Sequence, residues 1–197
     1  MKQTSFSVPF KLFGKWFKRA QGSEPDFPNA FAVATTTKAG APSVRMVLMK
    51  DWGEDGFVFY TNLESRKGLE LAENPQAAML FHWKSQGRQI RIEGVIEPVS
   101  AAEANAYYTT RPRSAQLGAW ASDQSRTMTG RHELKMRLAK FTTRFRKIAV
   151  ERPPYWSGYR LKPTYFEFWQ NRRSRLHERE VYKLNKDGTW TKEYLFP

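Results

Sequence analysis

The chain of 197 residues contains no cysteine. This absence excludes disulfide bonds, thiolate nucleophiles, zinc–thiolate sites and iron–sulfur clusters, and it fits a reducing compartment. The sequence also lacks a signal-peptide core and any run of about 20 apolar residues, so neither secretion nor a membrane span is predicted. We therefore expect a cytoplasmic protein that does not enter a membrane, and we predict no metal site.

Acidic residues are scarce relative to basic ones. Nineteen Asp and Glu stand against 33 Lys and Arg, which gives a formal net charge of +14. Such a charge attracts nucleic acid, acidic lipid or phosphorylated metabolites, and it does not choose among them. With 40% hydrophobic and 15% aromatic residues, the chain can bury a substantial core, and its length favours one compact domain.

Beyond residue 25, short runs rich in Val, Ile, Phe and Tyr alternate with turn-forming residues. The short connections between these runs favour antiparallel neighbours. We predict strands at residues 30–36, 43–50, 57–61, 77–83, 89–98, 155–161, 165–169 and 181–194. Many antiparallel strands with helices packed outside them predict a barrel of the α+β class.

Helical patterns occur at four places. Phe13, Trp16, Phe17 and Ala20 have helical spacing. This helix is predicted to cover the edge of the core, and a membrane surface is the alternative. Ser65 caps a helix to about residue 74, Ser100 and Glu103 form a capping box for a helix to about residue 109, and Leu134, Leu138, Phe141 and Phe145 mark an apolar stripe on another helix. We divide the chain into an N-terminal extension, 1–25, and a single domain, 26–197.

The helix that follows Ser65 has two cations, Arg66 and Lys67, in its first turn. The positive end of a helix dipole disfavours cations there by about 0.3 to 1 kcal/mol. The placement is reasonable if an anion such as a phosphate binds to the helix N-terminus, where backbone N–H groups and the Ser65 hydroxyl could also contact it. The alternative is a tolerant surface helix that carries two exposed basic residues.

The segment 167–179 is interpreted as a strand, a turn and a second strand. Because side chains alternate along a strand, Arg175, His177 and Arg179 would then share one face. Clustered cations repel one another unless an anion lies against them. A solvated edge strand that carries basic residues against aggregation is the alternative.

Further cations occur at other ordered positions. Arg45 and Lys50 bracket four apolar residues of a predicted strand, and Pro112 holds Arg111 in an extended conformation beyond a helix end. Taken singly, each is typical of an exposed position. Together they indicate a surface that binds phosphate, for which the planar guanidinium of arginine is well suited.

A series of motifs closely resembles the pyridoxamine 5'-phosphate oxidase family, from about residue 10 to residue 197. The motifs are Arg45-Met-Val-Leu-Met-Lys50, Tyr60-Thr-Asn62 with Ser65-Arg-Lys67, Arg88-Gln-Ile-Arg91, Arg111-Pro-Arg113 with Gln116-Leu-Gly-Ala-Trp120, Gln124-Ser125, Glu167-Phe-Trp-Gln170 and Arg175-Leu-His177. The resemblance implies an antiparallel split β-barrel that binds FMN. It also implies a homodimer with FMN at the interface and a C-terminal dimerisation region.

The resemblance implies functional residues as well. FMN would be bound by Arg45, Met46, Val47, Leu48, Met49, Lys50, Tyr60, Thr61, Arg66, Lys67 and Gln89 of one subunit and by Gln124, Ser125, Trp169 and Arg179 of the other. Substrate contacts would be Lys50, Tyr107, Arg111, Arg175 and His177, with Tyr107 and Arg111 near the substrate phosphate. Arg175 and His177 are the predicted catalytic residues, which would hold the C4' substituent and assist proton removal.

Two positions depart from the family pattern. Ala115 stands where the family commonly offers a serine hydroxyl to the substrate phosphate, and Ser114, one residue earlier, is the candidate replacement. The turn after Gln170 is often glycine-rich in the family, but here it is Asn171-Arg-Arg-Ser174, which adds positive charge.

The implied reaction oxidises pyridoxamine or pyridoxine 5'-phosphate to pyridoxal 5'-phosphate with O2 and releases H2O2. One alternative is a related flavin oxidase that acts on another reduced aromatic substrate, such as a dihydrophenazine. The presence of the full set of predicted substrate contacts argues against it, because an unphosphorylated substrate does not require that set, which is Lys50, Tyr107, Arg111, Arg175 and His177. Two further classes of function stay open. One is a basic nucleic-acid-binding barrel, for which no recognition motif is present, and the other is a protein that binds pyridoxal phosphate or flavin without turnover.

Overall fold

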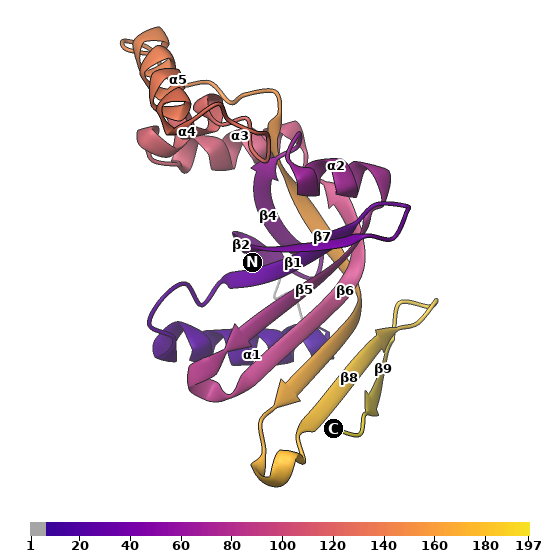
Figure 1. Ribbon diagram of the computed structural model, residues 1–197. Helices are drawn as coiled ribbons and strands as arrows, with labels where there is room; N and C mark the ends of the chain where they lie inside the picture. The colour runs from indigo at the N-terminus through magenta and orange to yellow at the C-terminus, as the bar shows by residue number, and fades with distance from the viewer. Residues whose placement is uncertain (1–6) are drawn as a thin grey trace, which may run out of the picture.

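The computed structural model describes residues 7–197, in which one antiparallel sheet curls into a half-barrel (Figure 1). Its main path has the order β2-β1-β5-β6-β7-β4-β3, and β8 and β9 extend the sheet from β7. The strands are β1 (Ala30–Thr36), β2 (Pro42–Leu48), β3 (Asp51–Gly53), β4 (Gly56–Asn62), β5 (Gln76–Trp83), β6 (Arg88–Pro98), β7 (Trp156–Gln170), β8 (Glu178–Leu184) and β9 (Trp190–Tyr194). The α+β architecture predicted from the sequence is confirmed.

The helices lie outside the sheet, and three of them gather in a lobe at one end of the molecule (Figure 1). They are α1 (Val8–Ser23), α2 (Arg66–Glu73), α3 (Ala101–Thr110), α4 (Arg113–Ala121) and α5 (Arg131–Arg144), of which α3, α4 and α5 form the lobe. Short 3-10 turns occur at Lys84–Gln86 and Arg173–Arg175. Within residues 7–197, no helix is long and apolar enough to cross a membrane.

Helix α1 packs its apolar face into the core. Phe10 and Phe13 are almost fully buried, and the Phe13 ring meets Phe57 edge-on at 4.8 Å and Phe81 at 5.4 Å between centroids. Because the aromatic side chains of α1 pack against the sheet, the prediction that this helix covers the core is confirmed, and the membrane-surface alternative is wrong. The division into an extension and a domain stays a prediction.

Strand β7 runs through the whole sheet. It replaces two predicted strands, 155–161 and 165–169, because Pro163 does not break it. The pairing of β6 with β7 shifts between Glu93 and Gly94, opposite this proline. Proline has no backbone N–H to donate, and at a bulge the strand needs no hydrogen bond from that position. A Cβ on Gly94 would lie 2.0 Å from the Lys162 carbonyl oxygen, so this close approach requires glycine.

Three further elements differ from the sequence prediction. The short strand β3 and the helix α4 were not predicted, and the predicted strand 181–194 is a hairpin of β8 and β9. Its turn contains Gly188 at a φ of 83°, a left-handed conformation that glycine adopts without strain. Helix α4 begins immediately after Pro112, whose ring is preorganised for a helix start as well as for an extended turn.

Candidate functional site

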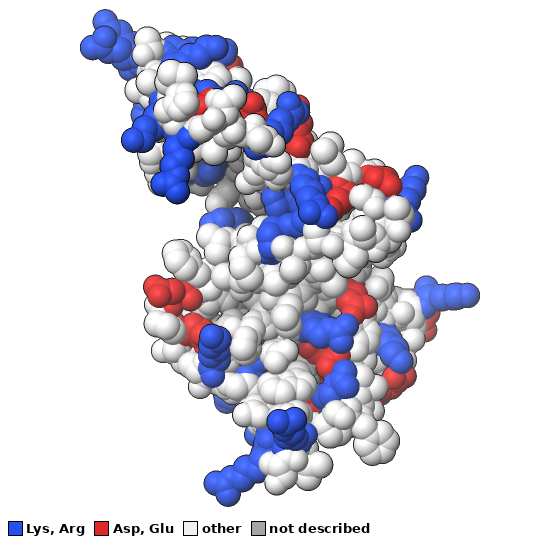
Figure 2. Space-filling model, viewed as in Figure 1, with Lys and Arg blue, Asp and Glu red and all other residues white. Residues whose placement is uncertain are grey.

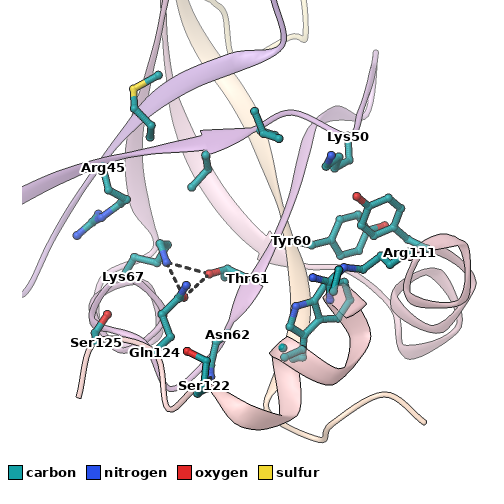
Figure 3. A pocket seen from close by; sticks show the side chains of 18 of the residues that line it. Arg45, Lys50, Tyr60, Thr61, Asn62, Lys67, Arg111, Ser122, Gln124 and Ser125 are labelled. Carbon is teal, nitrogen blue, oxygen red and sulfur yellow. Dashed lines mark hydrogen bonds between the residues drawn. The ribbon is translucent and has the colours of Figure 1, made fainter. Parts of the chain in front are cut away.

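A pocket of about 1100 Å³ opens between β2, β4, α2 and the lobe (Figure 3). In the space-filling view, Lys and Arg side chains gather around the narrow region between the barrel and the lobe (Figure 2). Most residues predicted to bind the cofactor or substrate line this pocket. They are Arg45, Met46, Val47, Leu48, Lys50, Tyr60, Thr61, Arg66, Lys67, Tyr107, Arg111, Ala115, Gln124 and Ser125.

At one end of the pocket, Lys67 is held by neutral groups. Its Nζ donates hydrogen bonds to Thr61 Oγ1 at 2.9 Å, Gln124 Oε1 at 3.0 Å and Ser65 Oγ at 3.3 Å (Figure 3). The side chain is 6% exposed, and within residues 7–197 it forms no ion pair. Burial, and then the charge of Arg45, lower the pKa of Lys67 to about 8. The lysine is therefore a buried cation without a counter-ion.

Arg45 is fixed beside Lys67 by a buried carboxylate. Its guanidinium lies 3.3 Å from Glu70 Oε2 and also donates to Thr35 Oγ1. Burial alone would raise the pKa of Glu70, but hydrogen bonds from Ser43, Thr35 and Arg66 and the charge of Arg45 outweigh it and lower the pKa to about 2. Glu70 thus stays ionised and orients Arg45 toward the pocket.

The N-terminus of α2 borders the same end of the pocket, as predicted, but Ser65 has a different role. The Ser65 side chain is fully buried; its Oγ accepts from the backbone N–H of Gly68 and donates to the Asn62 carbonyl oxygen at 2.6 Å. The hydroxyl is therefore an N-cap that is already occupied, and the prediction that it contacts an anion is wrong. Arg66 is 63% exposed and pairs with Glu70, so Lys67 is the buried cation at this helix end.

The other end of the pocket is an aromatic stack with cations beside it. Tyr60 stacks on Tyr107 at 4.1 Å and on Trp156 at 5.4 Å between ring centroids. The Arg111 guanidinium lies 4.7 Å from the Trp156 ring, and Lys50 Nζ lies 5.8 Å from the Tyr107 ring. Cations held over aromatic faces stay oriented without a carboxylate partner.

Arg111 is also incompletely satisfied. Its Nη1 is buried and has no hydrogen-bond partner within residues 7–197, and burial lowers the pKa of Arg111. Buried donors are almost always paired in folded proteins, so an orphaned guanidinium nitrogen indicates a missing anionic ligand. The pocket can therefore bind anionic groups at two separate ends, one at Lys67 and one at Arg111.

The predicted catalytic residues lie outside this pocket. Ser174 and Arg175 have φ values of 56° and 59°, so the chain makes a left-handed turn there and β8 begins only at Glu178. The prediction that Arg175, His177 and Arg179 share one strand face is therefore wrong. The His177 ring lies 4.6 Å from the Trp169 ring, and its Nδ1 accepts a hydrogen bond from the Arg172 backbone.

Gln89, Trp169 and Arg179 form a second group, in register across β6, β7 and β8. Arg179 Nε donates to Glu167 at 2.7 Å, and this carboxylate is 3% exposed. The resemblance assigns Gln89 to the subunit that supplies Arg45, but the structure places it with Trp169 and Arg179. Figure 1 shows β8 and the turn before it at the end of the molecule away from the lobe.

Gln124 and Ser125 are placed differently from what the resemblance implies. It assigns them to the partner subunit, but both line the pocket of the same chain as Lys67, and Gln124 bonds to Lys67 directly. Two other predicted positions also differ. The Met49 side chain is buried in the core, and Ser114 is exposed on α4 outside the pocket, so it does not replace the serine that is absent at Ala115.

Some pocket residues were not predicted from the sequence. They are Ser43, Val44, Asn62, Thr110, Pro112, Gly118, Ala119, Ser122 and Trp156. Asn62 lies within a family motif and Ser122 lies next to one, so their proximity to these motifs could have predicted that they line the pocket. Trp156 has no such signal, because only the pairing of β4 with β7 brings it beside Tyr60. No cluster of three or more potential metal ligands occurs among residues 7–197.

Two family models match the chain. Residues 25–145 match pyridoxamine 5'-phosphate oxidase, and residues 156–197 match the pyridoxine 5'-phosphate oxidase C-terminal dimerisation region. A pyridoxine/pyridoxamine 5'-phosphate oxidase of Sphingopyxis alaskensis is 56% identical over 96% of this chain and 87% of the relative. A relative of the same name from a Chelativorans species is 50% identical over 100% of this chain and 96% of the relative.

Solved structures agree with this assignment. PhzG from Burkholderia lata, in complex with tetrahydrophenazine-1-carboxylic acid, has a TM-score of 0.91 and 32% identity, and the match covers 98% of this chain and 95% of that chain. A pyridoxamine 5'-phosphate oxidase-related, FMN-binding protein from Nostoc punctiforme has a TM-score of 0.77 at 17% identity over 98% and 99% of the two chains, which shows a shared fold alone. The curled sheet is thus a split barrel, and the chain belongs to the pyridoxamine 5'-phosphate oxidase family.

Proposed function

We propose that this protein is an FMN-dependent oxidase that converts pyridoxamine or pyridoxine 5'-phosphate to pyridoxal 5'-phosphate, with O2 as the electron acceptor and H2O2 as a product. Oxidation of the alcohol removes one hydrogen from C4' and one from the hydroxyl group that C4' carries. Oxidation of the amine also consumes water and releases ammonium. The names of the 50–56% identical relatives support this function, and the family membership favours it over a nucleic-acid-binding barrel.

The observation that carries the proposal is the pair of pocket cations, Lys67 and Arg111, that have no carboxylate partner within residues 7–197. A buried cation without a counter-ion destabilises a folded protein, so such groups are typical of ligand sites. The two cations lie at different ends of one pocket (Figure 3). Two phosphate-bearing molecules, a flavin mononucleotide and a phosphorylated substrate, match this arrangement.

The flavin phosphate fits the end formed by Arg45, Arg66 and Lys67. The N-terminal N–H groups of α2 and the helix dipole favour an anion there. Lys67 is already oriented by Thr61 and Gln124, so little side-chain entropy is lost when a phosphate binds. When bound, FMN supplies the group that accepts the two electrons released at C4' of the substrate.

The substrate phosphate fits the other end, at Lys50, Tyr107 and Arg111. The stacking of Arg111 on Trp156 fixes the plane of its guanidinium, which suits bidentate contact with a phosphate. A hydrophobic substrate without a phosphate would leave Arg111 Nη1 unsatisfied. The orphaned nitrogen favours an anionic substrate, and the carboxylic acid bound by PhzG is also an anion. The 50–56% identity to pyridoxine/pyridoxamine 5'-phosphate oxidases, against 32% to PhzG, favours the phosphorylated pyridine.

The protein is a homodimer, as the match to a dimerisation region supports. We place the shared sites between the pocket of one subunit and the second group of its partner. Trp156 and Trp169 lie near opposite ends of β7, which at about 3.3 Å per residue runs roughly 45 Å along its path. Arg175 and His177 follow the far end of β7 and do not line the pocket of their own chain. We therefore infer that a second chain supplies the groups that hold the C4' substituent and remove its proton.

The test is an anaerobic mixture of the purified, FMN-loaded protein with pyridoxamine 5'-phosphate, followed by admission of O2. We expect the flavin absorbance to bleach, to return with O2, and to be accompanied by pyridoxal 5'-phosphate. Unphosphorylated pyridoxamine at the same concentration is the control, and it should bleach the flavin far more slowly. A flavin that binds but stays oxidised with the phosphorylated amine and alcohol would overturn the proposed substrate and leave the family assignment intact.

A further inference from the structure

A second cavity, of about 420 Å³, lies where the end of α1 meets the ends of β6 and β7. It is lined by three arginines and three neutral polar residues, which are Arg19, Arg88, Arg172, Ser23, Gln86 and Gln170. None of the lining residues is acidic, and none belongs to the flavin or substrate pocket. This cavity, which we call the arginine cavity, includes Arg172 of the unusual turn between β7 and β8.

Arg88, which lines the arginine cavity, is oriented by an aromatic ring and two amide side chains. Its guanidinium carbon lies 4.3 Å from the Trp16 ring, and its Nε and Nη1 each donate a 2.7 Å hydrogen bond, to Gln170 and Gln86 respectively. The partners are amide oxygens, so they orient the guanidinium without neutralising it. Its Nη2 has no hydrogen-bond acceptor among residues 7–197.

The charge of the arginine cavity is only partly balanced. Arg172 forms a two-point ion pair with Glu178, with both N···O distances at 2.8 Å. Neither Arg19 nor Arg88 forms an ion pair within residues 7–197, and the first six residues contain no Asp or Glu. Burial, and then the charges of Arg19 and Arg172, lower the pKa of Arg88, because both neighbouring cations disfavour its charged form.

We propose that the arginine cavity binds a phosphate dianion, either inorganic phosphate or the phosphate group of a small ester. Guanidinium groups from three segments would surround the ligand. The Ser23 hydroxyl accepts hydrogen bonds from Gln86 Nε2 at 2.9 Å and from Ser85 Oγ at 3.0 Å, so it can donate its own hydrogen to a remaining oxygen of the ligand. The bound anion would join α1, the start of β6 and the turn after β7. This site is separate from the two anion-binding ends of the main pocket and does not depend on the proposed reaction.

The experiment compares two charge-matched double variants of the FMN-loaded protein. Arg19→Gln with Arg172→Gln removes two cations of the cavity, and Lys18→Gln with Arg173→Gln removes the neighbouring exposed cations that do not line it. Binding of radiolabelled inorganic phosphate is measured by equilibrium dialysis at constant ionic strength. The flavin absorbance and circular dichroism of each variant show that it is folded and loaded.

We expect the wild-type protein and the control variant to bind phosphate equally. The cavity variant should lose one binding site per chain or bind there at least about tenfold more weakly, because each lost charge-assisted hydrogen bond weakens binding by about that factor. Competition with glycerol phosphate then distinguishes the two possible ligands. If glycerol phosphate displaces the labelled phosphate as well as unlabelled inorganic phosphate does, the site binds phosphate esters. If it displaces the label only weakly, the site binds inorganic phosphate. Equal phosphate binding by the two double variants would overturn the proposal.

Discussion

At the scale of single residues, Ala115 is the clearest departure within the substrate end of the pocket. It lines the pocket, but its methyl group cannot hydrogen-bond to a phosphate. We expect Ala115→Ser to lower the KM for pyridoxamine 5'-phosphate by up to about tenfold, because a hydrogen bond to a charged group contributes about 1.5 to 3 kcal/mol and part is lost to ordering. FMN affinity should not change.

The control for this substitution is Ser114→Ala. Ser114 is exposed and lies outside the pocket, so its removal should leave the KM unchanged. Steady-state kinetics with both variants distinguish the two positions. A KM that rises in Ser114→Ala, or that does not respond to Ala115→Ser, would show that α4 sits differently when substrate is bound.

Arg111 illustrates a residue that serves binding at the expense of stability. Burial of its unpaired Nη1 lowers the free energy of unfolding. A methionine of similar length has no polar atom that would need a hydrogen-bond partner there. Arg111→Met is therefore expected to raise the KM at least about tenfold, from the loss of a charge-assisted contact, without lowering the melting temperature of the ligand-free protein. Thermal unfolding and kinetics measure the two effects. A lower melting temperature with an unchanged KM would instead mean that Arg111 only supports Trp156.

At the scale of elements, the N-terminus of α2 is expected to make flavin binding depend on pH. The pKa of Lys67 in the folded, flavin-free protein is lowered from 10.5 to about 8. Its charge is lost as the pH rises through 8, while a flavin phosphate stays doubly ionised above about pH 7. We expect FMN affinity, measured by quenching of flavin fluorescence, to fall between pH 7 and 9.

Stability has the opposite pH dependence in this region. Between about pH 8 and 10.5 the unfolded chain binds more protons at Lys67 than the folded chain does. The burial of Lys67 therefore destabilises the flavin-free protein less as the pH rises.

Two variants test the role of Lys67 in flavin binding. Lys67→Met should abolish the change in FMN affinity near pH 8, whereas Arg66→Met, at an exposed position, should weaken FMN binding and keep that change. An identical pH profile in wild type and Lys67→Met would contradict the role of this lysine.

Local signals predicted most elements, and long-range contacts account for the exceptions. The bounds of β1 match the prediction because its alternation has a period of two, and Ser65 and Ser100 mark helix starts because they cap them. The spacing of Arg175, His177 and Arg179 at every second position fits a strand, but the backbone of Ser174 and Arg175 has the left-handed conformation of a turn. Neither is a glycine, so their residue types gave no signal of the turn.

The site was predictable as a set of residues and not as an arrangement. Motif resemblance and the cations after Ser65 identified both ends of the pocket. The grouping of these residues within one chain required the structure, since only strand register brings Gln89 beside Trp169, and only the loop after α4 brings Gln124 to Lys67. Trp156, the base of the aromatic stack, depends on a pairing between strands far apart in sequence.

At the scale of the whole molecule, the length of β7 separates the two halves of the proposed active site. The pocket of each chain is lined by residues of β2, β4, α2 and the lobe. Arg175 and His177 belong to the turn between β7 and β8, and this turn lies at the end of the molecule away from the lobe (Figure 1). A two-fold dimer can bring unlike ends of two chains together twice, which gives two equivalent sites. In the arrangement that we propose, each site would contain a pocket from one chain and the predicted catalytic pair from its partner.

Hybrid dimers test this sharing directly. Arg111→Met disables the pocket, and His177→Ala disables the residue contributed to the partner, so each homodimer should be nearly inactive at low substrate concentration. A hybrid purified with two affinity tags should recover about half of the wild-type activity, because one of its two sites contains only wild-type groups. A hybrid of Arg111→Met with Lys67→Met should recover none, since each pocket carries a defect. If the first hybrid stays inactive as well, His177 acts within its own chain and the subunits do not share their sites.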